Sequence, residues 1–330
     1  MSDDNNIKSS NYPFDPSYGY SLQQLLAVAT PREPKNFASF WQNRYQHALT
    51  LSPNPQLKDS GQTQAGWRVF EISYTSTNNC LIRGWLLLPQ SGIIKRGFII
   101  GHGYGGRDNP DWHLPFSDSA LLFPCFRGLG LSVQAGLSSD PQWHVLHHID
   151  SLEQYVLGGC VDDIWLAVTA LLQLFPHLAG HLGYLGISFG GGIGALALAW
   201  EQRIARGHLN APTFGAQPLR LRLPSQGSAN SVQNYCRSHK KQTLKTLSYY
   251  DAALAAKYIQ QPMHCACALF DPCVAPAGQF AIYNALTQYR QLFVLEAGHY
   301  DYPNKSKQEQ QLLSELNTFF APLIDNHSIV

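Results

Sequence analysis

The stretch YLGISFGGGIG, residues 184–194, places a serine between two glycines at Gly186-Ile187-Ser188-Phe189-Gly190. The pattern Gly-x-Ser-x-Gly is typical of a nucleophilic serine, but five residues alone are weak evidence. Here an apolar run of strand type precedes the serine, and a helical pattern follows it. A sharp strand-to-helix turn is the setting in which this motif exposes the serine hydroxyl at the end of a strand. The sequence therefore predicts that Ser188 is a nucleophile, and a plain glycine-rich turn is the alternative.

A phosphate-binding loop is a poorer explanation of the same glycines. The stretch lacks the Lys-Ser/Thr pair of a Walker loop, and its glycines do not have the Gly-x-Gly-x-x-Gly spacing of a dinucleotide site. No nucleotide cofactor is expected.

Outward from this stretch, short apolar strands alternate with helices. Strands are expected in RGFIIGHG, LGYLGIS, HCACALFD and QLFVLEAGH, and helices at residues 162–175, at residues 190–205, in AGQFAIYNAL and in KQEQQLLSELNTFF. Asp162 and Asp163 stand at the expected start of the first helix, where the helix dipole favours negative charge. Continuous apolar strands between helices indicate an α/β fold, with a mostly parallel sheet covered on both faces.

The first 65 residues are expected to form an N-terminal extension. A polar tail over residues 1–20 precedes helical patterns at residues 21–28 and 35–49. The alternating segments WRVFEISYTS and LIRGWLLLP predict a hairpin, with which a catalytic domain of residues 66–325 begins.

The composition excludes several classes of function. The 330 residues include 23 basic and 22 acidic ones, and the net charge of +1 argues against nucleic acid or an anionic membrane as partner. We see no apolar run of spanning length, and the polar start MSDDNNIKSS is unlike an export signal, so a cytoplasmic protein is expected. The seven cysteines lack metal or redox spacing, and most are expected to be buried reduced thiols, with a disulfide among them as the alternative.

A serine nucleophile needs a base that is oriented by a carboxylate, and in this class of sheet the chain order is serine, acid, histidine. Among the later aspartates only Asp271 directly follows a buried strand, HCACALF. Among the later histidines only His299 follows a strand and a glycine, in LFVLEAGH. We therefore expect Ser188, Asp271 and His299 to meet at the carboxyl edge of the sheet.

Two backbone N–H groups are expected to stabilise the oxyanion. One belongs to Phe189, directly after the nucleophile, and the other to Tyr104, in the HGYGG loop after the strand GFIIGHG. A flexible turn is the alternative for HGYGG.

These segments together resemble the acetyl xylan esterase / cephalosporin C deacetylase family of carbohydrate esterases, from about residue 40 to residue 320. FIIGHGYGG is similar to the family's oxyanion segment, GISFGG to its nucleophile segment, and TLSYYDAALAAKYIQQP and FDPCVAPAGQFAIYNAL to the segments around its acid. FRGLG stands where the family has Arg-Gly-Gln, and AGHY where it has His-Glu. The chain departs from the family at Leu129, Phe189 and Tyr300, where the family has glutamine, glutamine and glutamate.

The resemblance implies an α/β-hydrolase fold and a serine esterase that removes a small acyl group, acetyl above all, from a carbohydrate or similar alcohol. It implies a small-molecule ester as partner and permits a homo-oligomer, which in the family is often a hexamer. Arg127, Leu129, Trp112 and Tyr300 are candidate pocket residues, and the apolar Leu129 and Phe189 would favour apolar esters if their side chains face the pocket. Packing into the core is the alternative for both.

Two other classes of function stay open. A peptidase or lactone hydrolase can use the same fold, and the altered motifs permit a catalytically silent binding or scaffold protein. WHVLHH carries His144, His147 and His148, but only Asp150 stands near them as a further ligand. We therefore expect a surface or pocket loop there, and no metal site.

Overall fold

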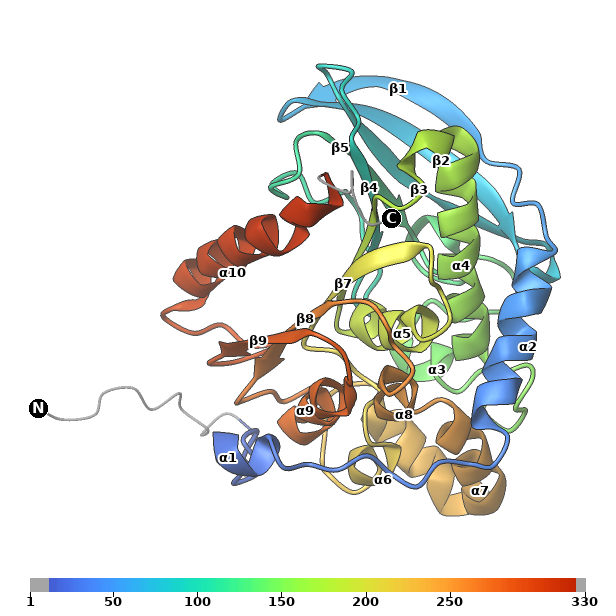
Figure 1. The fold of residues 1–330 in the computed structure, drawn as a ribbon. Helices are drawn as coiled ribbons and strands as arrows, with labels where there is room; N and C mark the ends of the chain where they lie inside the picture. Colours follow the sequence, from blue (N-terminus) through green and yellow to red (C-terminus); the bar gives the residue numbers. More distant parts are fainter. Residues whose placement is uncertain (1–11, 325–330) are drawn as a thin grey trace, which may run out of the picture.

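One twisted sheet organises the computed structural model, which describes residues 12–324 (Figure 1). Within the described residues the sheet has the strand order β1-β2-β3-β5-β4-β6-β7-β8-β9. The strands are β1 (Gln56–Gln64), β2 (Trp67–Ser76), β3 (Cys80–Pro89), β4 (Arg96–Gly101), β5 (Ser119–Pro124), β6 (Leu182–Ile187), β7 (Ile204–Asn210), β8 (Met263–Ala268) and β9 (Arg290–Leu295).

The pairing changes direction once along the sheet. Strands β1, β2, β3 and β5 pair antiparallel, whereas β5, β4, β6, β7, β8 and β9 form a continuous parallel series. The carboxyl ends of the parallel strands therefore lie at one edge of the sheet, and the loops after β4, β6, β8 and β9 are neighbours there.

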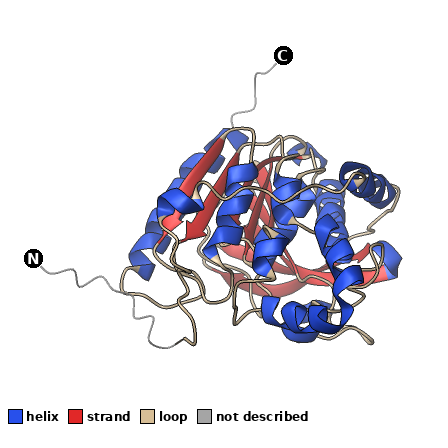
Figure 2. Cartoon of the chain, turned by 90° about the horizontal axis from the view of Figure 1, so that it is seen from below, coloured by secondary structure: helices blue, strands red, loops and turns tan. Residues whose placement is uncertain are grey.

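Helices lie on both faces of the sheet (Figure 2). Helices α2, α4, α5, α8 and α9 contribute to the larger buried cluster on one face, and α10 packs into the cluster on the other. The helices are α1 (Leu22–Leu25), α2 (Phe37–Leu49), α3 (Pro141–His144), α4 (Val156–Leu174), α5 (Phe189–Leu198), α6 (Gln217–Arg220), α7 (Ala229–Tyr249), α8 (Ala252–Ala256), α9 (Pro276–Ala285) and α10 (Lys305–Phe320). This arrangement confirms the predicted α/β-hydrolase fold.

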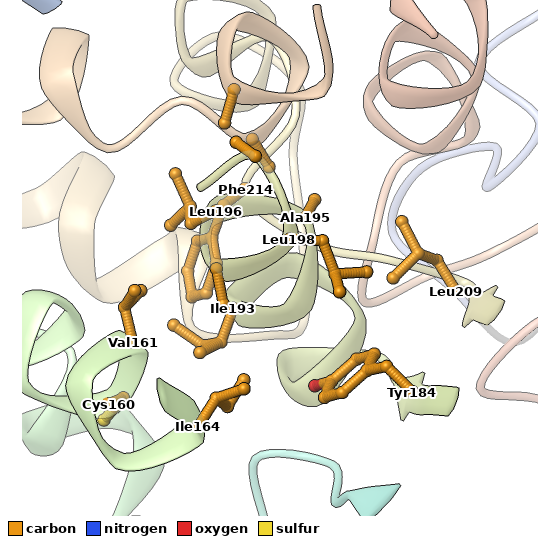
Figure 3. Packing of buried hydrophobic residues seen from close by; sticks show 14 of the residues in the cluster. Cys160, Val161, Ile164, Tyr184, Ile193, Ala195, Leu196, Leu198, Leu209 and Phe214 are labelled. Carbon is orange, nitrogen blue, oxygen red and sulfur yellow. The ribbon is translucent and has the colours of Figure 1, made fainter. Parts of the chain in front are cut away.

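Helix α5, which begins directly after Ser188, is enclosed in the larger cluster. Every residue from Phe189 to Leu198 is buried. Figure 3 shows its side chains against those of α4, β6 and β7, with Ile193 and Leu196 facing Val161 and Ile164. The position of the helix start is therefore fixed by the core.

Helix α4 differs from the expectation in a way that changes the role of its aspartates. It begins at Val156 rather than at residue 162, so Asp162 and Asp163 lie inside the helix and not at its positive end. Both are buried and each pairs with an arginine, Asp162 with Arg44 and Asp163 with Arg127, at N–O distances of 2.7 and 2.6 Å. The expected dipole interaction is wrong because buried ion pairs neutralise these carboxylates instead.

The same helix corrects the expectation that no apolar run has spanning length. By length and composition α4 could cross a membrane, with a mean hydropathy of 1.4 over its most apolar window. However, 83% of that window is buried inside the fold. In this structure α4 is a core helix.

Several element boundaries also differ from the expected ones. The helix expected at residues 190–205 ends at Leu198, and residues 204–210 form strand β7. The expected domain boundary after residue 65 falls in the turn between β1 and β2, which pair with each other, so β1 belongs to the same sheet as the catalytic strands. Residues 1–11 of the expected tail and residue 325 lie outside the described residues. All seven cysteines are free thiols.

Candidate active site

Ser188 lies on a strained turn between β6 and α5. Its backbone has φ 53° and ψ −108°, a conformation that is rare for a residue with a Cβ and costs roughly 1–3 kcal/mol. Hydrogen bonds hold it there: its N–H donates to Asn210 O at 2.7 Å, and its carbonyl accepts from Thr213 N at 3.1 Å. The turn leaves the hydroxyl at the carboxyl end of β6.

Gly190 allows α5 to begin against the end of β4. A Cβ on Gly190 would lie 2.6 Å from the carbonyl carbon of Gly101, so a side chain there would force the two segments apart. The Gly190 N–H donates to His102 O at 2.9 Å. This close approach places the HGYGG loop beside Ser188, since a Cβ on Gly103 would be 4.0 Å from that of Ser188.

The structure brings Ser188, His299 and Asp271 together. The Ser188 hydroxyl donates to His299 Nε2 at 2.8 Å, and His299 Nδ1–H donates to Asp271 Oδ2 at 2.8 Å. The serine follows β6, the aspartate follows β8 and the histidine follows β9. The arrangement is that of a nucleophile, a base and a carboxylate that orients the base.

Asp271 is fully buried and its carboxylate is held from both sides. Oδ1 accepts from the backbone N–H groups of Cys273 and Val274, both at 2.9 Å, and Oδ2 accepts from Gln279 Nε2 at 2.9 Å. Gln279 is itself fixed, because its Oε1 accepts from Ala268 N at 2.8 Å. The carboxylate is therefore oriented toward His299 by partners that cannot easily move.

Gln279 is a residue of the site that the sequence did not predict. Its signal was an amide inside the apolar helical pattern AGQFAIYNAL, eight residues after the acid. A buried side-chain amide needs hydrogen-bond partners, and here one of those partners is the Asp271 carboxylate.

The ionisation of His299 reflects two opposed effects. Burial lowers the pKa of His299, whereas the charge of Asp271 and the hydrogen bond to it raise the pKa, and the net result lies above the ordinary histidine value. The imidazolium is thus stabilised by Asp271, as a general base requires after it takes a proton.

Two backbone N–H groups beside Ser188 have no acceptor within the described residues. Phe189 is the first residue of α5, so its N–H has no partner within the helix. The Tyr104 N–H likewise has no protein acceptor in residues 12–324. The Tyr104 ring stacks on the Phe189 ring at 4.0 Å, and its hydroxyl donates to His144 Nδ1 at 3.0 Å. These contacts hold the HGYGG loop against the start of α5.

Of the candidate pocket residues, Tyr300 lines a hollow of about 600 Å³ that also includes His299. Ile187, Leu295 and Tyr302 form much of its apolar wall. Trp112 packs on the α10 side of the sheet, in the cluster of Phe98 and Phe116, and is not a lining residue of this hollow.

Leu129, Phe189 and Arg127 require a correction of the expected pocket. Leu129 is 1% exposed and Phe189 is fully buried, so both side chains pack into the core and neither presents an apolar surface to a substrate. Arg127 forms the buried ion pair with Asp163 and lines a different cavity.

The three histidines of WHVLHH do not gather around a common centre. His144 is buried, and its Nε2–H donates to the Arg127 carbonyl at 3.0 Å, which leaves Nδ1 to accept from Tyr104. Burial lowers the pKa of His144 to about 4. Across residues 12–324 no group of three or more potential ligands is arranged to hold a metal.

Comparison with known proteins places this geometry in a family. A model of the acetyl xylan esterase family matches residues 20–316. The acetyl xylan esterase from Paenibacillus sp. R4 superposes with a TM-score of 0.78 at 20% identity, over 90% of this chain and 99% of that one. Acetyl xylan esterase 1 from Thermoanaerobacterium sp. JW/SL YS485 gives a TM-score of 0.76 at 20% identity, over 92% and 99% of the two chains.

A more distant structural neighbour has a different activity in its name. The acylaminoacyl peptidase of Pyrococcus horikoshii gives a TM-score of 0.59 at 14% identity, over 80% of this chain but only 43% of that one. This likeness shows the shared fold alone. Because the family model spans most of the sequence, the predicted resemblance is confirmed: the chain belongs to the acetyl xylan esterase family of carboxylic ester hydrolases.

Proposed function

We propose that this protein removes acetyl groups from a carbohydrate or similar small alcohol through an acyl-enzyme on Ser188. The observation that carries the proposal is the pair of 2.8 Å hydrogen bonds that join Ser188 to His299 and His299 to Asp271. The hydroxyl, the imidazole and the buried carboxylate are connected in the order that nucleophilic catalysis needs.

In the first half of the reaction, Ser188 Oγ attacks the ester carbonyl while His299 Nε2 accepts its proton. Asp271 stabilises the imidazolium, and the N–H groups of Phe189 and Tyr104 stabilise the oxyanion. His299 then protonates the leaving alcohol oxygen. In the second half, His299 deprotonates a water that attacks the acyl carbonyl, and Ser188 leaves with the proton.

The test is turnover of p-nitrophenyl acetate and of acetylated xylo-oligosaccharide by three variants. Ser188→Ala, Asp271→Asn and His299→Ala should each lower kcat by roughly 10³-fold or more, with losses that are far from additive. Ser314→Ala, an exposed serine on α10, is the matched control and should keep full activity. Near-full activity of Ser188→Ala would disprove the nucleophile.

The alternatives differ in what they do with acyl substrates. A peptidase would cleave acylated amino-acid amides, and a silent binding protein would release no burst of p-nitrophenol. No contact in residues 12–324 favours either one over the esterase.

We further propose that the substrate is a free small molecule in the cytoplasm and that the protein assembles as a homo-oligomer. Analytical ultracentrifugation measures the assembly directly.

A further inference from the structure

A second large cavity lies apart from the serine site, and we call it the α4 cavity. Its volume is about 820 Å³, and it lies between the start of α4, the turn from β2 to β3, and the loop segments 134–137 and 147–148. Ser188, Asp271 and His299 are not among its lining residues. Its volume falls within the range of roughly 300–1,000 Å³ that is usual for small-molecule sites.

The wall and mouth of the α4 cavity carry neutral polar side chains. Within residues 12–324 the side chains of Asn78, Asn79, His147, His148 and Gln154 line the cavity and make no hydrogen bond to protein. Each of these groups can both donate and accept a hydrogen bond. Such a set matches a ligand that also presents many groups of both kinds.

The backbone of the lining is strained at three of these residues. Asn78, Asn79 and His148 have positive φ values of 59°, 55° and 55°. A conformation of this kind costs free energy in a residue with a Cβ and persists where the surrounding structure imposes it, commonly at binding sites. These three polar residues lie together in the lining of one cavity.

Arg127 provides a buried hydrogen-bond donor at the floor of the α4 cavity. Arg127 is 6% exposed, and its Nε and Nη2 donate to Asp163, Ser76 and Thr77, whereas its Nη1 has no protein acceptor in the described part of the chain. Gly159 makes room for this group, because a Cβ there would lie 2.3 Å from Nη1. The Nη1 protons are therefore available to a ligand.

The charges of the lining select against ions. Arg127 and Arg44 are the positive side chains of the cavity, and each is already paired with a buried aspartate of α4. Glu153 is the one lining carboxylate, and it has no cationic partner within residues 12–324. An anion would meet Glu153 and two neutralised arginines, so a neutral ligand is favoured.

From these observations we propose that the α4 cavity binds a neutral, hydroxyl-rich ligand, one to three sugar units, at a site separate from the catalytic serine. Hydroxyl groups pair with the amides, the imidazoles and Arg127 Nη1, while Leu137 and Val156 contact the C–H face of the ring. The proposal does not rest on the catalytic assignment, because binding can be measured in a protein without turnover.

The test is calorimetric titration of Ser188→Ala protein with xylotriose. We expect saturable binding at one site, weakened at least tenfold when His147→Leu and Gln154→Leu are added, since each change removes hydrogen bonds. Gln288→Leu, an exposed glutamine at the opposite edge of the sheet, is the matched control and should leave the affinity unchanged. Circular dichroism and thermal unfolding should show that the variants are folded.

Three results would overturn the proposal. The first is the absence of saturable binding over the millimolar range in folded Ser188→Ala protein. The second is binding that the two cavity changes leave unaltered, which would place the sugar elsewhere. The third is saturable binding of inorganic phosphate that displaces xylotriose, which would make the cavity an anion site. None of these results would bear on the turnover test of Ser188.

Discussion

Ser188 and His299 share a backbone feature that is unusual for their residue types. Their φ values are 53° and 47°, in the region that favours glycine. Ser188 directly follows β6, His299 lies in the loop after β9, and each is hydrogen-bonded to a neighbouring segment. Ser188 Oγ and His299 Nε2 lie 2.8 Å apart, so both strained residues carry reacting atoms of the site.

The pH dependence of activity should report the ionisation of His299. The imidazole must be neutral to accept the serine proton, so kcat/KM should fall as the pH drops through the pKa of His299. Because the Asp271 charge holds that pKa above its ordinary value of 6.5, the midpoint should lie above pH 6.5. Asp271→Asn removes the charge, and its lower residual activity should have a midpoint at lower pH. An unchanged midpoint in Asp271→Asn would contradict the role given to Asp271.

At Leu129 the buried position changes what a substitution should do. The family glutamine placed here by Leu129→Gln would bury an amide among apolar neighbours, at a cost of about 1–3 kcal/mol in the free energy of unfolding. Urea unfolding measures this loss. Leu131→Gln is the matched control, because Leu131 is 42% exposed and should change stability little. A Leu129→Gln protein of full stability and altered substrate preference would instead show that the side chain at position 129 faces the pocket.

At the scale of elements, the N-terminal segment of residues 12–20 lies against the loop that carries Asp271. The Asp271 N–H donates to Pro16 O at 3.0 Å, and the Tyr18 hydroxyl donates to Pro224 O at 2.6 Å. The Tyr12 ring meets those of Phe270 and Tyr300 at 6.1 and 6.0 Å. This segment therefore supports the residues on both sides of the catalytic acid and base.

Deletion of residues 1–19 should lower kcat on an acetyl ester by about five- to tenfold, the equivalent of one lost hydrogen bond of about 1 kcal/mol. Ser21, which caps α1, is kept, so the rest of the fold should remain. Tyr12→Ala is the milder comparison, because it removes the ring contacts but keeps the Pro16 carbonyl. Circular dichroism tests the fold. A folded deletion protein with parental kcat would show that the segment has no positioning role.

Strand ends account for what the sequence could predict of the site. Ser188 directly follows β6, and Asp271 and His299 lie in the loops that follow β8 and β9. The parallel sheet brings these loops to one edge, so local patterns were sufficient. Strand β7 escaped prediction because Arg206 and His208 interrupt its apolar run. The central helices could also be predicted from local apolar patterns. The residues at which these helices begin could not.

Partners distant in the sequence account for what could not be predicted. In the sequence, Asp162 and Asp163 resemble the acidic start of a helix. In the structure they pair with Arg44 and Arg127, of which Arg44 is distant in the sequence. Leu129 and Phe189 stand in sequence motifs that border the active site. Only the packing of Phe126, Tyr104 and Phe214 around Phe189 shows that its side chain points into the core. Side-chain direction in a loop depends on such tertiary contacts, which no local pattern contains.

At the scale of the whole molecule, the fold buries several histidines in neutral form. Burial lowers the pKa of His102 to about 3, and burial lowers the pKa of His208 and that of His264 as well. His208 and His264 lie on neighbouring strands with their Nδ1 atoms 3.0 Å apart, so one proton is shared and a second would meet like charge. His208 and His264 are buried on β7 and β8, and His102 is buried in the loop after β4, so each imidazole is removed from water.

Stability should therefore fall on acidification between pH 6.5 and about pH 4. Below pH 6.5 the unfolded chain binds protons at these histidines, whereas the folded chain does not until the pH nears 4 at His144 and 3 at His102. Asp251 acts in the opposite direction, since burial raises its pKa to about 6, and so does His299 near neutral pH, since Asp271 raises its pKa, but these are two groups against several. Urea unfolding at pH 7, 6 and 5 should show a free energy of unfolding that declines by several kcal/mol. His208→Asn removes one such histidine and should flatten the decline, whatever it does to stability at pH 7. A free energy of unfolding that stays constant from pH 7 to pH 5 would mean that these histidines bind protons in the folded protein.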